Sequence, residues 1–379
     1  MPDGSSWGSG SPERSGSKLY APKVGQRACD LCKRVNHDDV FEIMVTIAME
    51  TEAIHNKRFQ FHDMDVAVHR HTFARDVAFG LTAPQKWLPP KYFYDERGSH
   101  LYEQICALPE YYLYRAELEI LSTYAAEIHA EIGHLALVEF GSGYARKTRY
   151  LLTAYEWAGQ PFRYCPVDIS REILLDTANR LLQEYTHIEI RAMHTDFAGE
   201  PEVIQAFQLE KKAVAFFGSS LGNFTPEESV EFLRRTAAIL GPEDVFLLGI
   251  DLKKSSAILV PAYDDAQGVT AAFNQNVLHR INYELGGRFD PQTFEHVALY
   301  NAERGRIEMH LRSRLSQHVP VIKIEQTMSF RKDETIHTES SYKYTLEEFA
   351  RLARAAGFIV EGVWTDPQQF FSVQYLKVV

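Results

Sequence analysis

The sequence predicts a doubly wound α/β fold joined to a second, smaller α+β domain. The first sign is a short apolar strand at 135–140 that runs into the turn Gly141-Ser142-Gly143 and then into a helix near Lys147. The second sign is the alternation of apolar strands and amphipathic helices from 162 to 251. Such alternation is typical of a parallel sheet covered by helices on both faces. After 251 the alternation stops and a long helical and strand-rich segment follows, which indicates the second domain.

The composition is that of a soluble globular protein. The chain has 379 residues, 45% of them hydrophobic and 24% charged, enough for one large domain or two modest ones. A formal net charge of -11 disfavours general attraction to nucleic acid or anionic lipid. No stretch approaches the roughly 18 apolar residues of a membrane span, and the chain begins with a Gly/Ser-rich stretch instead of an apolar signal peptide. We therefore expect a cytoplasmic monomer with a small-molecule substrate and with no nucleic-acid or membrane partner.

The first part of the chain, 1–62, is expected to be an extension that is largely disordered at its start. Residues 1–18 are mostly Gly, Ser, Pro and charged residues, which bury little apolar surface. Cys29 and Cys32 form a CxxC pair that could supply half a zinc site or a redox pair. A second CxxC is missing, so we expect no metal site. Residues 39–55 have the apolar spacing of a short helix.

Aromatic residues dominate the segment that opens the globular part. Residues 87–95 combine two prolines with four aromatic side chains, and a helical pattern continues to Leu108. The pattern predicts a proline-bounded helix start with tyrosines packed as amphipathic core residues. The next predicted helix, 115–132, carries apolar residues at helical spacing, and we expect Glu117 and Glu119 to be exposed on it.

The glycine turn after the first strand indicates a nucleotide-like site. Glycine lets the backbone approach a ligand closely at the carboxyl end of a strand, where doubly wound sheets bind ligands. The dinucleotide fingerprint G-x-G-x-x-G is incomplete, because Arg146 occupies its third glycine position. NAD is therefore disfavoured. With Glu139, the turn has the form E-x-G-x-G, which methyltransferases that use S-adenosylmethionine carry.

Later strands supply the remaining parts of such a pocket. The second strand ends in Asp168, placed to accept hydrogen bonds from ribose hydroxyls. The third leads to Asp196 and Phe197, an acid suited to an adenine amino group and an apolar neighbour for its ring. The fourth runs into a glycine-rich loop at Gly218. Either acid alone could be a helix N-cap, but the ordered series favours a cofactor pocket. The strands and the helix among them are predicted at 162–170, 171–184, 187–192 and 214–217.

Seven motifs occur in order between about residue 63 and the C-terminus. They are Lys91-Tyr-Phe-Tyr-Asp95, Leu108-Pro-Glu-Tyr-Tyr112, Gly141-Ser-Gly143, Phe217-Gly-Ser-Ser-Leu-Gly-Asn-Phe224, Ala262-Tyr-Asp-Asp265, Arg306-Ile-Glu-Met309 and Thr338-Glu-Ser-Ser341. Together they resemble the histidine N-α-methyltransferases of ergothioneine biosynthesis. The resemblance implies a Rossmann-like class I methyltransferase core, S-adenosylmethionine as cofactor, and trimethylation of L-histidine to its betaine, hercynine.

The resemblance also implies how the chain divides. The methyltransferase core would comprise 116–252 and 344–379. The substrate-binding domain would be built from 63–115 joined to 253–343. The second domain would then be formed partly by the segment before the core and partly by an insertion within it.

Site residues follow from the matched motifs. The residues implied to hold the cofactor are Gly141, Gly143, Lys147, Asp168, Asp196 and Phe197. Among them, Lys147 would lie near the carboxylate of the cofactor. Gly218 and Ser220 would border the methyl-transfer site, with Tyr94 near the amine. The implied substrate contacts are Asn223 and Tyr263 for the carboxylate, and Tyr111, Glu339, Ser341 and Met309 for the imidazole.

Glu339 is the residue that favours histidine over other aromatic amino acids. A buried carboxylate can accept the ring N–H of an imidazole, whereas a phenyl, phenol or indole ring would leave it badly paired or clashing. Sites built around such a polar partner reject analogues that lack it by about 10⁴-fold or more. The other interpretation of Glu339 is a surface residue on a strand at 336–344.

The expected chemistry is in-line displacement by an uncharged amine, with proximity and alignment supplying most of the catalysis. The sequence shows no dedicated strong base, and the number of transfers is implied by the resemblance alone. The alternatives are an N-methyltransferase of tryptophan or tyrosine type and a non-catalytic binding module on the same fold.

Overall fold

The computed structural model describes residues 57–64, 68–197 and 200–379. The Cys29/Cys32 pair, the helix predicted at 39–55 and most of the predicted extension lie outside these residues.

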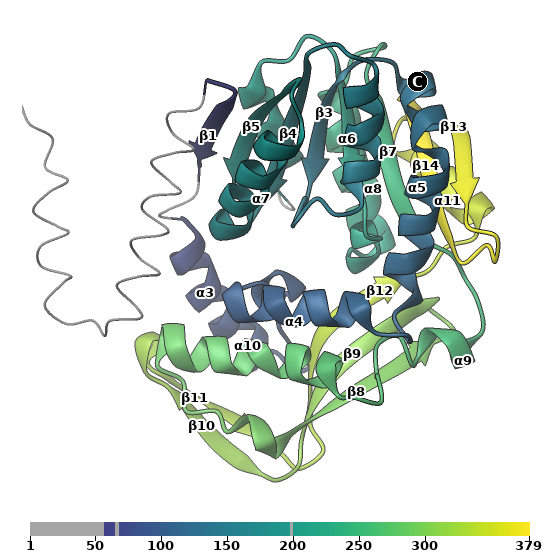
Figure 1. Cartoon of the computed structure of the whole chain (residues 1–379). Helices are drawn as coiled ribbons and strands as arrows, with labels where there is room; N and C mark the ends of the chain where they lie inside the picture. The colour runs from purple at the N-terminus through teal and green to yellow at the C-terminus, as the bar shows by residue number, and fades with distance from the viewer. Residues whose placement is uncertain (1–56, 65–67, 198–199) are drawn as a thin grey trace, which may run out of the picture. The chain divides into compact units, whose positions relative to one another are not determined.

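An eight-stranded sheet forms the larger part, in the order β1-β5-β4-β3-β6-β7-β14-β13 (Figure 1). Neighbouring strands are parallel from β1 to β7, whereas β14 is antiparallel to both β7 and β13. The strand bounds are β1 Phe59–Asp63, β3 Ala136–Phe140, β4 Phe162–Asp168, β5 Ile188–His194, β6 Lys212–Phe216, β7 Val245–Asp251, β13 Phe358–Thr365 and β14 Phe371–Val378. The predicted doubly wound sheet is thus confirmed, because the chain adds β4 and β5 on one side of β3 and β6 and β7 on the other.

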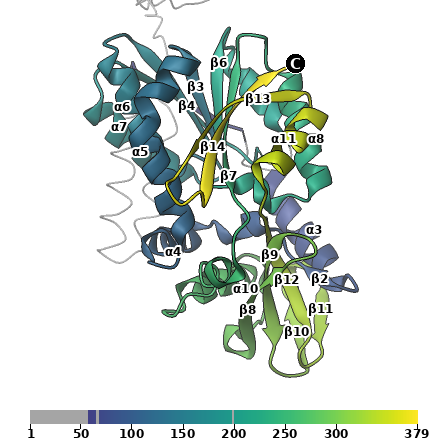
Figure 2. The same ribbon diagram turned by 90° about the vertical axis from the view of Figure 1, so that its right-hand side faces the viewer.

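Helices cover both faces of this sheet. Figure 2 shows α5, α6 and α7 on one face and α8 and α11 on the other. Successive residues of β3 enter different cores, Leu137 the cluster on one face and Val138 the cluster on the other. Burial on both faces explains why these strands are continuously apolar. The helix bounds are α5 Tyr112–Ile132, α6 Thr148–Trp157, α7 Arg171–Glu184, α8 Pro226–Ala238 and α11 Leu346–Ala355.

A smaller four-stranded sheet, in the order β2-β12-β9-β8, forms the second part with a separate β10-β11 hairpin. Helix α10 packs on this sheet, and α4 lies between α10 and the larger sheet (Figure 1). The bounds are α3 Val68–Thr82, β2 Lys86–Trp87, α4 Glu96–Ala107, α9 Ser256–Leu259, α10 Val269–Leu285, β8 Phe294–Asn301, β9 Arg306–Ser313, β10 Gln317–Val321, β11 Gln326–Phe330 and β12 Thr335–Tyr342. Short 3₁₀ helices lie at Pro90–Phe93, Pro201–Phe207, Ser220–Asn223, Pro291–Thr293 and Ile322–Ile324.

The chain passes between the two sheets at neighbouring positions. After β7 it leaves the larger sheet at Leu252, and after β12 it returns at Tyr344, where the two residues form a parallel bridge. The Tyr344 N–H donates to the Asp251 carbonyl at 3.2 Å, and the Lys253 N–H donates to the Tyr344 carbonyl at 2.9 Å. These crossings coincide with the ends predicted for the inserted segment, although the assignment of two functional domains remains a prediction.

The main sheet begins earlier than the predicted boundary at 62. Strand β1, at the end of the predicted extension, pairs in parallel with β5, and Phe59 is buried in the core. Arg58 donates to the carbonyls of Leu182 and Tyr185, both at 2.8 Å, at the carboxyl end of α7. Periodicity could not reveal this strand because its five residues, Phe-Gln-Phe-His-Asp, alternate too briefly to stand out.

Candidate functional site

Two adjoining cavities lie at the carboxyl ends of the central strands, facing the smaller sheet. The larger has a volume of about 260 Å³ and the smaller about 50 Å³. Their shared lining consists of Tyr94, Tyr102, Gly218, Ser220 and Asn223. The cavities therefore meet at a boundary that includes Tyr94, Gly218 and Ser220, the three residues predicted beside the reacting groups.

All six residues predicted to hold the cofactor line the larger cavity: Gly141, Gly143, Lys147, Asp168, Asp196 and Phe197. The turn after β3 supplies the two glycines, which adopt positive φ angles of 65° and 50°. A side chain is strained in this left-handed region, and a Cβ at Gly141 would also come within 3.5 Å of the Phe197 ring. The turn therefore exposes its backbone to the cavity.

Asp168 is tied to the glycine turn. Its carboxylate accepts the Gly143 N–H at 2.8 Å and the Ser170 N–H at 2.9 Å. Burial raises the pKa of Asp168, and these backbone donors counter that rise. Each carboxylate oxygen has a second lone pair, so the group can still accept hydrogen bonds from a diol.

Asp196 and Phe197 form another wall of the larger cavity. Lys91 Nζ lies 2.8 Å from Asp196 Oδ2, which links the segment before α4 to the end of β5. The Phe197 ring stacks on Phe140 with the centroids 4.9 Å apart and an interplanar angle of 22°. An apolar wall with an acid beside it suits a flat heterocycle that carries an amino group.

Glu117 is buried, which corrects the expectation that it is exposed, whereas Glu119 is exposed as predicted. Glu117 forms an ion pair with Lys147, and both of its oxygens accept the Gly218 N–H, at 2.8 and 2.9 Å. Burial alone would lower the pKa of Lys147, but the Glu117 carboxylate raises it overall. Helical spacing showed a glutamate between apolar positions but could not show the cation and the amide that compensate its burial.

The loop after β6 forms the boundary between the cavities. Gly218 and Ser219 adopt positive φ angles of 80° and 58°, and a 3₁₀ turn, Ser220–Asn223, follows. Ser219 is buried, and its Oγ accepts the Asp251 N–H at 3.0 Å. The end of β7 therefore holds the strained loop in position.

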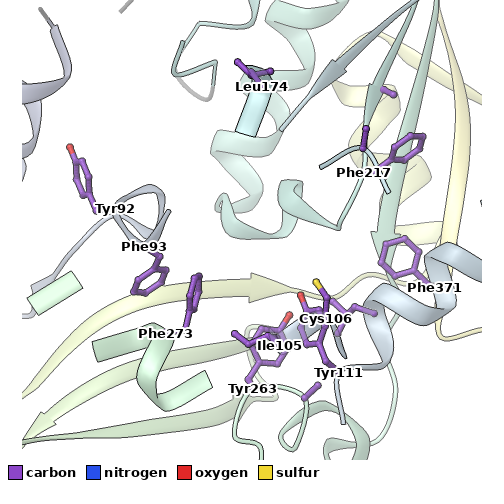
Figure 3. Packing of buried hydrophobic residues seen from close by; sticks show 14 of the residues in the cluster. Tyr92, Phe93, Ile105, Cys106, Tyr111, Leu174, Phe217, Tyr263, Phe273 and Phe371 are labelled. Carbon is purple, nitrogen blue, oxygen red and sulfur yellow. The ribbon is translucent and has the colours of Figure 1, made fainter. Parts of the chain in front are cut away.

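All nine residues predicted for the substrate and the methyl-transfer site line the smaller cavity: Tyr94, Tyr111, Gly218, Ser220, Asn223, Tyr263, Met309, Glu339 and Ser341. They come from both sheets and from the segments between them. The Tyr111 and Tyr263 rings meet edge to face with the centroids 6.3 Å apart, and Figure 3 shows the two side chains next to each other. Burial raises the pKa of Tyr94 and Tyr111 well above the ordinary value, so both hydroxyls stay protonated.

The Glu339 carboxylate lines this cavity without a hydrogen-bond donor among the described residues. Burial raises its pKa to about 7, and the nearby Lys343 ammonium acts in the opposite direction. The surface interpretation of Glu339 is therefore wrong. A mostly buried acceptor without a protein donor is suited to a ligand that brings its own N–H.

Tyr263 and Ser341 belong to a buried polar cluster behind the smaller cavity. Their hydroxyl oxygens lie 2.8 Å apart, and each lies 2.8 Å from Lys343 Nζ. Lys343 is paired with Asp251 at 2.6 Å, and both side chains are fully buried. Asp251 also accepts hydrogen bonds from Tyr112, at 2.7 Å, and from Lys254, at 2.6 Å.

Four residues around the cavities were missed by the sequence analysis. Glu117 lies between apolar positions of a helix and Asp251 ends an apolar strand, and these irregularities were the available signal. Lys343 follows a mostly polar strand and gave no such signal. Tyr102, which lines both cavities, had no signal beyond its place in an aromatic-rich segment.

Comparison with known proteins decides the family. Residues 73–378 match a family described as "Histidine-specific methyltransferase, SAM-dependent". The chain belongs to this family. It is therefore a methyltransferase that uses S-adenosylmethionine, as the glycine turn and the two acids indicated.

Curated relatives of this methyltransferase agree with the family. A "Histidine N-alpha-methyltransferase" of Mycolicibacterium smegmatis is 45% identical over 299 residues, 79% of this chain and 92% of the relative. "Ergothioneine biosynthesis protein 1" of Neurospora crassa is 32% identical over 75% of this chain and 32% of its own length. An "L-tryptophan methyltransferase" of Psilocybe serbica is 28% identical over 79% of this chain and 90% of its own length.

The larger cavity of this methyltransferase fits S-adenosylmethionine in its donor set. The Gly141 turn offers a close backbone approach, Asp168 offers an acceptor for a diol, and Phe197 offers an apolar wall for a heterocycle.

Among the described helices, none is long and apolar enough to cross a membrane.

Proposed function

We propose that this methyltransferase transfers methyl groups to the α-amino group of L-histidine and repeats the transfer until the trimethylated betaine, hercynine, is formed. The observation that carries the proposal is the Glu339 carboxylate, which has no described protein donor in a cavity that adjoins the cofactor-type cavity. An imidazole supplies a ring N–H for that carboxylate. The sequence relatives named for histidine methylation and for ergothioneine biosynthesis support the same substrate.

The proposed roles follow from the lining of the cavities. Asn223 and Tyr263 bind the substrate carboxylate, and Tyr111, Glu339 and Ser341 bind the imidazole, with Met309 against the ring. Tyr94, Gly218 and Ser220 line both cavities, so they border the place where the amine meets the methyl group. When bound, S-adenosylmethionine supplies an electrophilic methyl group on a sulfonium.

The chain itself contributes binding, orientation and exclusion of water. The amine attacks as the uncharged base, so it loses a proton to solvent or to a water ordered by Tyr94 before each transfer. Because Tyr94 stays protonated, it orients that proton transfer and does not act as a strong base. Alignment of the amine in a narrow cavity accounts for most of the expected rate enhancement.

The test is mass spectrometry of the protein incubated with S-adenosylmethionine and an equimolar mixture of histidine, tryptophan, tyrosine and phenylalanine. We expect histidine to gain three methyl groups, and Glu339→Ala to lose most of this preference. The control is Glu295→Ala, which removes a half-buried glutamate from β8 of the same sheet; Glu295 pairs with Arg312 and does not line the smaller cavity, so the preference should stay intact.

Methylation of another amino acid would retain the reaction but reject histidine as the substrate. Accumulation of a singly or doubly methylated product after long incubation would reject trimethylation. Absence of any methylation would favour a non-catalytic binding role for the chain.

A further inference from the structure

The Lys343 ammonium lies directly behind the smaller cavity. Its side chain is fully buried, and its Nζ contacts Asp251 at 2.6 Å and the hydroxyls of Tyr263 and Ser341 at 2.8 Å each. An ammonium group has three N–H donors and no acceptor. The three contacts therefore use all of its protons.

These contacts restrict what the two hydroxyls can do. Tyr263 and Ser341 each accept a hydrogen bond from Lys343, and one of them donates a hydrogen bond to the other across 2.8 Å. Two hydroxyl protons are present and one is used between the two residues, so one remains to be donated into the cavity. If Ser341 donates to Tyr263, the phenol proton is the one that faces a ligand.

We propose that Lys343 is a positioning residue for substrate recognition, which holds Ser341 and Tyr263 so that Tyr263 donates its hydroxyl proton to the substrate carboxylate. The proposal rests on the proposed function, since it takes a free amino acid as the ligand. A carboxylate can only accept hydrogen bonds, so its presence favours the direction Ser341 to Tyr263 to carboxylate.

Charge supports the same role. Without Lys343, the negative charge of Asp251, which already acts on the Tyr263 phenol, would repel a substrate carboxylate bound to Tyr263. The Lys343 ammonium also lies 4.8 Å from the Tyr263 ring centroid, so its positive charge fixes the ring as well as the hydroxyl. Hydrogen bonds in such a buried chain polarise one another, which strengthens the phenol as a donor.

The location of Lys343 connects substrate recognition to the cofactor side. Lys343 lies in the segment that returns to the larger sheet, and Asp251 is the last residue of β7. The Asp251 backbone N–H donates a hydrogen bond to Ser219 Oγ. The ion pair between Lys343 and Asp251 therefore joins the hydroxyls of Tyr263 and Ser341 to the strained loop that borders the methyl-transfer site.

The test measures dissociation constants of L-histidine and histamine by calorimetry, with S-adenosylhomocysteine bound to the full chain. Histamine keeps the imidazole and the amine but lacks the carboxylate. We expect Lys343→Met to weaken histidine binding about tenfold or more and histamine binding by less than about threefold, because a hydrogen bond to a charged group is lost for histidine alone. A merely structural role of Lys343 would weaken both ligands by the same factor.

Three further variants complete the experiment. Tyr263→Phe should reduce the preference for histidine over histamine by a similar factor, and Lys343→Met added to Tyr263→Phe should cost little more. Lys253→Met removes a surface lysine paired with Glu348 and should leave both dissociation constants unchanged.

The outcomes separate the two proposals. Equal weakening of histidine and histamine in Lys343→Met, or no weakening of either, overturns the role of Lys343 even if the wild-type chain methylates histidine. Should Lys343→Met fail to bind S-adenosylhomocysteine, an unchanged preference in Tyr263→Phe overturns the proposal instead. A wild-type chain that selects another amino acid in the methylation assay rejects the proposed function, and this result is independent of every variant.

Discussion

Glu117 shows how one buried residue can organise the cofactor side of the site. It receives the Lys147 ammonium and the Gly218 N–H, and so links α5 to α6 and to the loop after β6. Space for its carboxylate exists because Gly249 on β7 has no side chain, and a Cβ there would collide with Glu117. The pair Glu117 and Gly249 is therefore a steric and electrostatic unit.

We predict that Gly249→Ala weakens the binding of S-adenosylhomocysteine at least about fivefold, because Glu117 must move away from Lys147 and Gly218. Overpacking should also lower the free energy of unfolding by about 1–3 kcal/mol. Calorimetry and urea denaturation measure the two effects. Gly241→Ala is the control, since the nearest atom to its new Cβ would lie 3.8 Å away, and equal binding by both variants would contradict the prediction.

We expect the ionised Glu339 carboxylate to lower the free energy of unfolding, although it provides substrate selectivity. Burial raises its pKa from 4.5 to about 7, so the folded protein binds this proton more tightly than the unfolded chain does. Stability contributed by the protonated carboxyl is therefore fully present below about pH 4.5 and is lost as the pH rises through about 7. The loss amounts to at most about 3 kcal/mol, at about 1.4 kcal/mol for each unit of pKa.

Glu339→Gln should accordingly raise the melting temperature at pH 8, with the difference disappearing as the pH falls towards 5. Thermal unfolding of both proteins across this pH range measures it, with the exposed Glu119→Gln as a control that should show no such trend. A difference in melting temperature that is the same at every pH would show that the ionised carboxylate is not the cause.

At the scale of elements, β1 closes one edge of the larger sheet. It pairs with β5 through Phe59↔Ile190 and the four pairs that follow, and Phe59 fills the core beneath that edge. The strand therefore stabilises the element that leads to Asp196 and Phe197.

Phe59→Ala should lower the free energy of unfolding by about 3 kcal/mol, because it leaves a cavity under β5. Gln60→Ala, at the exposed neighbouring position, should change it by less than about 0.5 kcal/mol. Urea denaturation compares the two variants. If both behave like the wild type, β1 contributes no packing to the sheet.

At the scale of the whole described part, the site lies where the chain crosses twice between two sheets. Both crossings, at Leu252 and Tyr344, lie beside the Asp251 and Lys343 ion pair, so the cluster behind the smaller cavity is also the connection between the sheets. Because the cavities share Tyr94, Gly218 and Asn223, a shift of one sheet relative to the other would change both cavities together.

The sequence by itself determined the doubly wound sheet, because strands buried on both faces are continuously apolar and their helices are amphipathic. It also determined the glycine turn and the acids at the strand ends, since these depend on local backbone chemistry, and the family follows from motifs in order. All fifteen predicted site residues line the two cavities. The six cofactor residues line the larger cavity and the other nine line the smaller one, four of them lining both, although their individual roles stay predictions.

Only the tertiary structure decided the burial of Glu117, the pairing of Lys343 with Asp251 and the place of β1 in the sheet. The physical reason is common to the three. A charged side chain can be buried only where partners compensate it, and an edge strand is stable only where a neighbour accepts its hydrogen bonds. Those partners lie far away in the sequence, so no local pattern records them.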